Sequence, residues 1–155
     1  MQNRREMLSH SAKVAAMLAG VGLMPQVARA QAAGYNTVAF AAKTLPEVMK
    51  ALGAGTPAES KDVTITGPDI AENGAVVPVG AATTLPGVKR LLILVEKNPS
   101  MLVAAFDITD AIEANISTRV KMGQSSDVYA VAMMNDGKVL FARKEVKVTL
   151  GGCGG

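Results

Sequence analysis

The chain has 155 residues, of which 49% are hydrophobic and 3% aromatic, and its formal net charge is +3. That length suits one compact domain. Four of the sixteen basic residues and one of the thirteen acidic residues precede position 31, so residues 31–155 carry twelve of each. This balance leaves no basic footprint, and we expect neither a nucleic-acid partner nor attraction to an anionic membrane surface.

Residues 1–30 have the features of an export signal in the expected order. Arg4-Arg5 supply a charged start, residues 12–24 are apolar, and Ala28-Arg29-Ala30 fits a cleavage site. The segment 3–8 resembles the bacterial twin-arginine signal, with an ordinary Sec signal as the alternative. Because the apolar stretch is shorter than the ~20 residues that span a bilayer, we expect no retained membrane anchor. The prediction is a twin-arginine signal peptide over residues 1–30 and a periplasmic protein.

Cleavage after residue 30 would remove His10, the only histidine, and leave Cys153 as the only cysteine. Such a chain cannot contain a Ser-His-Asp or Cys-His relay, a histidine-containing metal site or an intramolecular disulfide. We therefore expect no metal, no cofactor and no catalysis by the chain alone. Its chemistry must use one thiol, carboxylates or another protein.

The first part of the processed chain predicts one short helix. Residues 31–43 are Ala-rich and are expected to be loosely ordered. Thr44-Leu45-Pro46-Glu47 matches a capping box, with proline in the first turn, and Gly53 begins the stop signal after Leu52. Apolar residues at helical spacing follow the cap, so this helix should pack one face on a core.

From position 63 onward the pattern predicts about seven short strands separated by turn residues. The expected strands are Val63–Thr66, Ala75–Val79, Val88–Val95, Met101–Ile108, Ile116–Met122, Val128–Met133 and Val139–Leu150. Pro78 favours an edge or a bulge for its strand, Asn98-Pro99-Ser100 suggests a hairpin, and Asn135–Lys138 indicates a tight turn. The spacing predicts an all-β, antiparallel sandwich over residues 31–150. No alternating βα rhythm or phosphate-binding loop is present, which argues against a nucleotide-binding α/β fold.

The chain ends in Gly151-Gly152-Cys153-Gly154-Gly155, a thiol flanked by two glycines on each side. Glycine removes bulk around the sulfur and raises the entropic cost of ordering the segment, so we expect residues 151–155 to form a flexible arm. Such an arm could pass the sulfur into a narrow channel while the β-domain stays outside. Nothing in the tail lowers the thiol pKa, so activation is expected from groups that a partner supplies.

This tail on an exported chain resembles the SoxY family of the bacterial Sox thiosulfate-oxidation system, and segment 68–79 is also similar to that family. The resemblance covers most of residues 31–155 and implies an immunoglobulin-like β-sandwich in a heterodimer with a second β-protein, SoxZ. It implies that sulfur intermediates are held covalently on Cys153 while a c-type cytochrome couples thiosulfate to it. A hydrolase then releases sulfate, and in some organisms a sulfane dehydrogenase oxidises the remaining sulfur. Gly151, Gly152, Gly154 and Gly155 would give the arm its flexibility.

Other interpretations of the chain remain open. Cys153 could be an incidental thiol on a secreted structural or interaction module, whereas a thiol oxidoreductase lacks a second cysteine. Four methionines could suggest a copper site, although core packing is the better interpretation; they are Met101, Met122, Met133 and Met134. Three carboxylates could suggest a metal site, and exposed turns explain them equally well; they are Asp107, Asp110 and Glu113. The basic pairs could be solvated strand ends or could take part in electrostatic docking; they are Lys89-Arg90 and Arg143-Lys144. A long exposed edge would invite pairing with the partner, and we expect the last strand to be that edge.

Overall fold

The computed structural model describes residues 36–149, and the predicted signal peptide and arm lie outside them. The described residues form two helices and nine strands. Their bounds are α2 Thr37–Ala41, α3 Leu45–Ala51, β1 Pro57–Glu59, β2 Val63–Thr66, β3 Ile70–Ala71, β4 Val77–Thr83, β5 Val88–Val95, β6 Leu102–Asp107, β7 Asn115–Val120, β8 Ser126–Met134 and β9 Val139–Val148.

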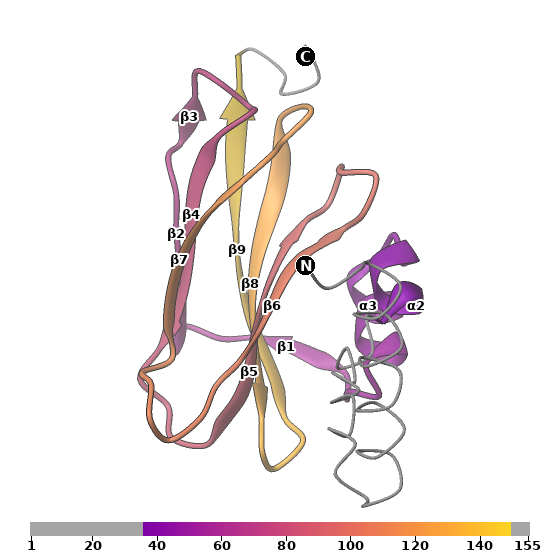
Figure 1. The fold of residues 1–155 in the computed structure, drawn as a ribbon, viewed down its shortest axis with the longest axis vertical. Helices are drawn as coiled ribbons and strands as arrows, with labels where there is room; N and C mark the ends of the chain where they lie inside the picture. The colour runs from indigo at the N-terminus through magenta and orange to yellow at the C-terminus, as the bar shows by residue number, and fades with distance from the viewer. Residues whose placement is uncertain (1–35, 150–155) are drawn as a thin grey trace, which may run out of the picture. The chain divides into compact units, whose positions relative to one another are not determined.

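The strands form two sheets that face each other, with the helices on the outer side of the larger sheet (Figure 1). The larger sheet has the order β1-β9-β8-β5-β6, and β3 also pairs with β9. The smaller sheet has the order β2-β4-β7. This arrangement confirms the predicted all-β sandwich. The pairing is not wholly antiparallel, however, because β1 and β3 run parallel to β9.

Helix α3 confirms the predicted capping box. The Glu47 backbone N–H donates to Thr44 Oγ1 at 3.4 Å, and the Thr44 N–H donates back to Glu47 Oε2 at 3.2 Å. The Lys43 N–H adds a third bond to the same carboxylate oxygen at 2.9 Å. These donors stabilise the charged carboxylate, and the bond from the Lys43 backbone contributes most to holding the Glu47 pKa below its usual value.

Residues 31–43 were expected to be loosely ordered; 31–35 lie outside the described residues, and helix α2 corrects the expectation for Thr37–Ala41. Asn36 caps this helix by accepting from the Ala39 N–H at 3.0 Å, and its side-chain amide donates to Ala51 O of α3 at 2.9 Å. A five-residue helix is too short to be stable alone. Tertiary contacts hold it: Ala39 is fully buried, and Ser100 Oγ donates to Phe40 O at 2.7 Å.

The larger sheet is buried on both faces at its centre. In β5, Leu91, Ile93 and Val95 enter the core between the sheets. Leu92 and Leu94 of the same strand instead pack beneath the helices. Burial on both faces explains the continuous apolar run from Leu91 to Val95, whereas β2 of the smaller sheet alternates between apolar and polar residues.

Pro78 predicts an edge or a bulge rather than a central position for its strand, and the structure corrects this for the strand as a whole. Strand β4 is central in its sheet, between β2 and β7. However, β2 pairs only with Gly80–Thr83, so Pro78 has a strand neighbour on one side alone, through Arg119 of β7. The proline therefore occupies the part of a central strand where its missing N–H removes no ladder bond to β2.

The methionines are packing residues, as expected. Met101 and Met122 are buried. Met133 packs beneath the helices and Met134 against the core between the sheets, which confirms that these neighbours on β8 face opposite ways.

Candidate functional site

The structure shows how the end of the last strand, β9, is held. The N–H of Val148, the last residue of β9, donates to Ser125 Oγ at 2.9 Å, and the Thr149 N–H donates to Ala71 O at 3.1 Å. The Thr149 hydroxyl donates to Glu72 O at 3.0 Å. Three hydrogen bonds therefore hold residues 148–149 to two other segments of the chain. We call Ala71, Glu72, Ser125, Val148 and Thr149 the arm base.

The sequence places these residues together through strand pairing. Strand β3 is only two residues long, and it pairs parallel with β9 so that Ile70 is opposite Lys147 and Ala71 is opposite Val148. The Lys147 N–H also donates to Asp69 O at 2.9 Å. The chain thus returns from the smaller sheet to the end of β9 and joins the edge of that strand just before the C-terminal segment begins (Figure 1).

The segment after β3 is also held in place. Asn73 Oδ1 accepts from the Ala75 N–H at 2.8 Å, which closes a turn, and Gly74 O accepts from the Met122 N–H at 2.7 Å. This bond ties the loop after β3 to the segment between β7 and β8. The arm base is thus built on hydrogen-bonded backbone rather than on a free loop.

Charges beside the arm base are balanced. Lys144 Nζ contacts Asp69 Oδ1 at 2.9 Å and donates to Gly67 O at 2.6 Å. The bond from Lys144, together with its charge, holds the pKa of Asp69 below its usual value. Glu72 and Lys147 are exposed, with opposite charges. These four side chains together contribute no net charge beside the arm base.

The predicted site residues Cys153, Gly151, Gly152, Gly154 and Gly155 lie outside the described residues. The arm base itself was not predicted from the sequence. Ser125 belongs to a polar run after Met122, which indicates a loop without revealing the partner of its hydroxyl. The pairing of β3 with β9 joins residues 77 positions apart, and no local pattern predicts such a contact.

The last strand is a partly covered edge rather than the open one that we expected. Strand β1 pairs with Val139–Phe141 and β3 with Lys147 and Val148. Only the stretch between them has no strand on its outer side within residues 36–149. The Lys144 side chain reaches from this stretch to Gly67 and Asp69. The expectation of a long free edge for a partner is therefore wrong, because two short strands cover both of its ends.

The other candidate sites have structural explanations. Arg90 Nε donates to Asp107 Oδ1 at 2.6 Å, which makes Lys89-Arg90 part of a surface ion pair. Within residues 36–149, no group of three or more His, Cys, Asp or Glu residues is placed to hold a metal ion. Among those residues, too, no helix is both long and apolar enough to cross a membrane.

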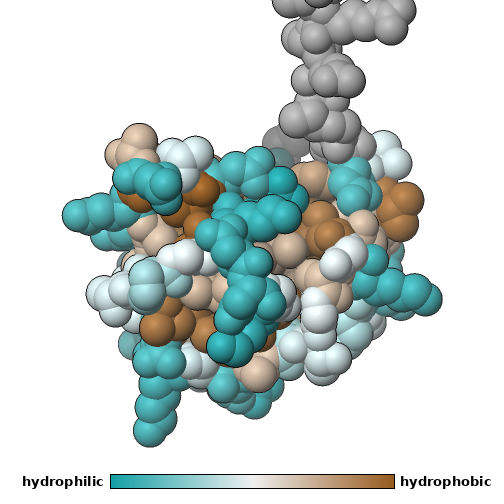
Figure 2. All heavy atoms as spheres, turned by 90° about the horizontal axis from the view of Figure 1, so that it is seen from below, coloured by the Kyte–Doolittle hydropathy of each residue, from teal (hydrophilic) through white to brown (hydrophobic). Residues whose placement is uncertain are grey.

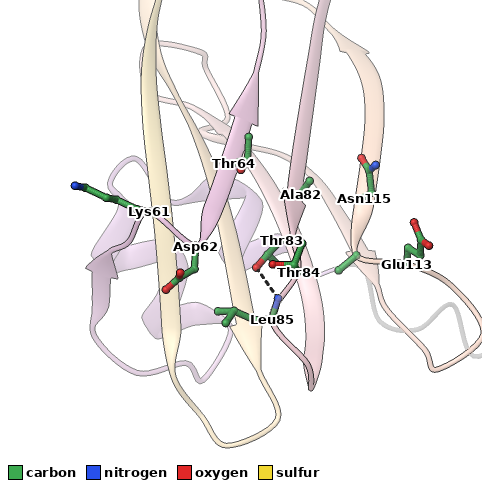
Figure 3. Close-up of a pocket in the computed structure, with 10 residues that line it drawn as sticks. Lys61, Asp62, Thr64, Ala82, Thr83, Thr84, Leu85, Glu113 and Asn115 are labelled. Atoms are coloured by element: carbon green, nitrogen blue, oxygen red, sulfur yellow. Dashed lines mark hydrogen bonds between the residues drawn. The ribbon is translucent and has the colours of Figure 1, made fainter.

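A shallow pocket of about 600 Å³ lies at the far end of the sandwich from the arm base. It is formed where β2 begins, β4 ends and β7 begins, and Thr83 Oγ1 accepts from the Leu85 N–H across its floor at 3.2 Å (Figure 3). Lys61, Asp62 and Glu113 bring the charges. Seen from this end, hydrophilic side chains surround small, separate hydrophobic areas (Figure 2). The pocket has no nucleophile paired with a base, so its geometry indicates no reaction.

Comparisons with known proteins point to one family. The family model for "Sulfur oxidation protein SoxY" matches residues 48–153. The structure of the sulfur carrier protein SoxY from Chlorobium limicola f thiosulfatophilum shares 35% identity, with a TM-score of 0.60 over 68% of this chain and 94% of that one. A superoxide reductase (neelaredoxin) from Ignicoccus hospitalis shares 18% identity, with a TM-score of 0.50 over 56% of this chain and 78% of that one. This second likeness concerns the fold alone. No curated protein matches the sequence.

Proposed function

Because the chain belongs to the SoxY family of sulfur carriers, we propose that it holds sulfur intermediates of thiosulfate oxidation covalently on Cys153. The family match extends to residue 153, the only cysteine of the chain. That single observation carries the proposal. The glycines on both sides would let the sulfur enter the active sites of partner enzymes.

The proposed loading step forms one S–S bond. The Cys153 thiol loses its proton, the sulfur joins the outer sulfur of thiosulfate, and two electrons pass to a c-type cytochrome. A hydrolase then adds water to the terminal sulfonate, which leaves as sulfate while the persulfide stays on Cys153. A sulfane dehydrogenase would oxidise that remaining sulfur where one is present. In this scheme the chain is a substrate carrier, and its partners perform catalysis.

The proposed setting is the periplasm, after export through the signal in residues 1–30. There the carrier would form a heterodimer with a SoxZ-like β-protein. A lone thiol in an oxidising compartment is a liability unless it is used, which favours a carrier over an incidental thiol.

Reconstitution with thiosulfate, the cytochrome and the hydrolase of the same host tests the proposal. We expect Cys153→Ser to abolish both cytochrome reduction and sulfate release. The folded domain should be unaffected, because the substitution lies beyond the last strand; the thermal midpoint checks this. Turnover by the serine variant at the wild-type rate would refute the covalent role of the cysteine.

A further inference from the structure

Two large apolar side chains are exposed on the chain segment that contributes Ala71 and Glu72 to the arm base. Ile70 on β3 is 58% exposed, and Val76 in the loop before β4 is 53% exposed. Their sequence neighbours Ala71 and Val77 are buried in the core between the sheets. Ile70 and Val76 therefore face away from that core. A partner that covered them would remove apolar surface from water, which favours association.

Both side chains are presented by fixed backbone. Strand β3 pairs with β9. The Thr149 N–H donates to the carbonyl of Ala71, the last residue of β3, and the Thr149 hydroxyl donates to the carbonyl of Glu72, the first residue of the loop. The Val76 N–H donates to Asn73 O at 3.4 Å, and the same loop is tied to Met122. A preordered surface loses little conformational entropy when a partner docks on it.

The length of the chain beyond Thr149 limits where a partner can sit. Cys153 follows Thr149 by four residues, and each extended residue spans at most about 3.6 Å, so the Cys153 Cα lies no more than about 14 Å from the Thr149 Cα. An enzyme that takes the sulfur into its interior uses much of this reach as channel depth. The mouth of its channel must then lie against the arm base and the side chains around it.

We infer that Ile70 and Val76 form a docking rim for the enzymes that load and unload Cys153, and that it meets an apolar channel mouth. This inference rests on the proposed function. The balanced charges of Glu72 and Lys147, and of Asp69 and Lys144, leave apolar contact as the main attraction at this end of the domain. A rim of two side chains suits a carrier that must release each enzyme quickly, since small interfaces are typical of transient encounters.

A pair of matched double variants tests the rim. Ile70→Thr with Val76→Thr makes the rim polar while keeping β-branched side chains. Val38→Thr with Ile112→Thr makes the same kind of change at two sites that are 67% and 50% exposed, on α2 and in the loop between β6 and β7. The measurement uses the complete exported protein with its β-protein partner, and follows kcat/KM of the cytochrome and of the hydrolase for the carrier.

We expect the rim variant to lose about tenfold in kcat/KM with both enzymes, with kcat little changed, because the lost contacts are in docking rather than chemistry. The control variant should stay within twofold, and a small maleimide should label Cys153 equally fast in all forms. Equal kcat/KM in the rim and control variants would overturn the inference. Loss of the heterodimer in the rim variant alone would also overturn it, because Ile70 and Val76 would then contact the β-protein partner instead of the enzymes. If Cys153→Ser still turns over, the proposed function itself fails, whatever the rim variants do.

Discussion

At the scale of single residues, Gly80 of β4 has no room for a side chain. It pairs with Thr66 of β2 and with Ser117 of β7. A Cβ atom at this position would lie 2.4 Å from Thr66 Oγ1 and 2.9 Å from Ile116 O. A side chain could rotate away, whereas the Ile116 carbonyl belongs to the strand ladder. Glycine is therefore required here for close packing across three strands.

We expect Gly80→Ala to reduce the free energy of unfolding by about 1–3 kcal/mol, the usual cost of overpacking. Adding Thr66→Ala should recover only part of the loss, because the contact with the Ile116 carbonyl remains. Gly67→Ala is the matched control: its Cβ would meet ordinary contacts at 3.5 and 3.6 Å, and the change should stay within about 0.5 kcal/mol. Urea unfolding measures all three. Equal stability of the Gly80 and Gly67 variants would contradict this account of the sheet.

Asp69 should contribute to the acid sensitivity of the arm-base region. Its pKa is lowered by the bond and charge of Lys144, so the carboxylate stabilises the fold above its unfolded pKa and loses this effect as pH falls through the folded value. Asp69→Asn should lower the thermal midpoint slightly at pH 7, and the gap to wild type should close below about pH 4. Asp110→Asn, whose carboxylate forms no salt bridge within the described residues, is the control. A gap that widens in acid would show that the pair does not act this way.

At the scale of elements, the capping box predicted α3 from the sequence. Helix α2 and strands β1 and β3 were not predicted, because tertiary contacts rather than their own residues stabilise them. The strand from Val88 to Val95 has the predicted bounds because its last five residues, Leu91–Val95, are apolar and turn residues lie near both of its ends. Helix α2 and strands β1 and β3 have five, three and two residues. Elements of that length are stabilised by the strand or helix they contact, so their own sequence contains little signal.

The capping box of α3 gives a prediction at this scale. Helix α3 covers the outer face of the larger sheet with Val48 and Met49, so a weaker cap should loosen that contact. Thr44→Ala should cost about 1 kcal/mol of unfolding free energy. Thr56→Ala, at an exposed threonine without a hydrogen bond in the described part of the chain, should change little. If calorimetry gives the same midpoint for both variants, the cap does not stabilise the domain.

At the scale of the whole molecule, sequence and structure define complementary parts of the proposed site. The sequence alone indicates the cysteine and its glycines, because their composition is unusual for a packed segment. The structure adds the arm base, which depends on a β3–β9 contact and on side chains such as Ser125 whose partners are distant in sequence. The exposed residues Ile70 and Val76 have an ordinary sequence pattern, and only the pairing of β3 with β9 brings Ile70 to the end of the last strand.

Intact mass spectrometry of the carrier, taken during thiosulfate turnover, tests the central claim most directly. The account predicts a mass gain equal to one thiosulfate-derived group, which maps to the peptide containing Cys153, disappears with a thiol reductant and never forms in Cys153→Ser. Sustained sulfate release from a carrier whose C-terminal peptide remains unmodified throughout would contradict it.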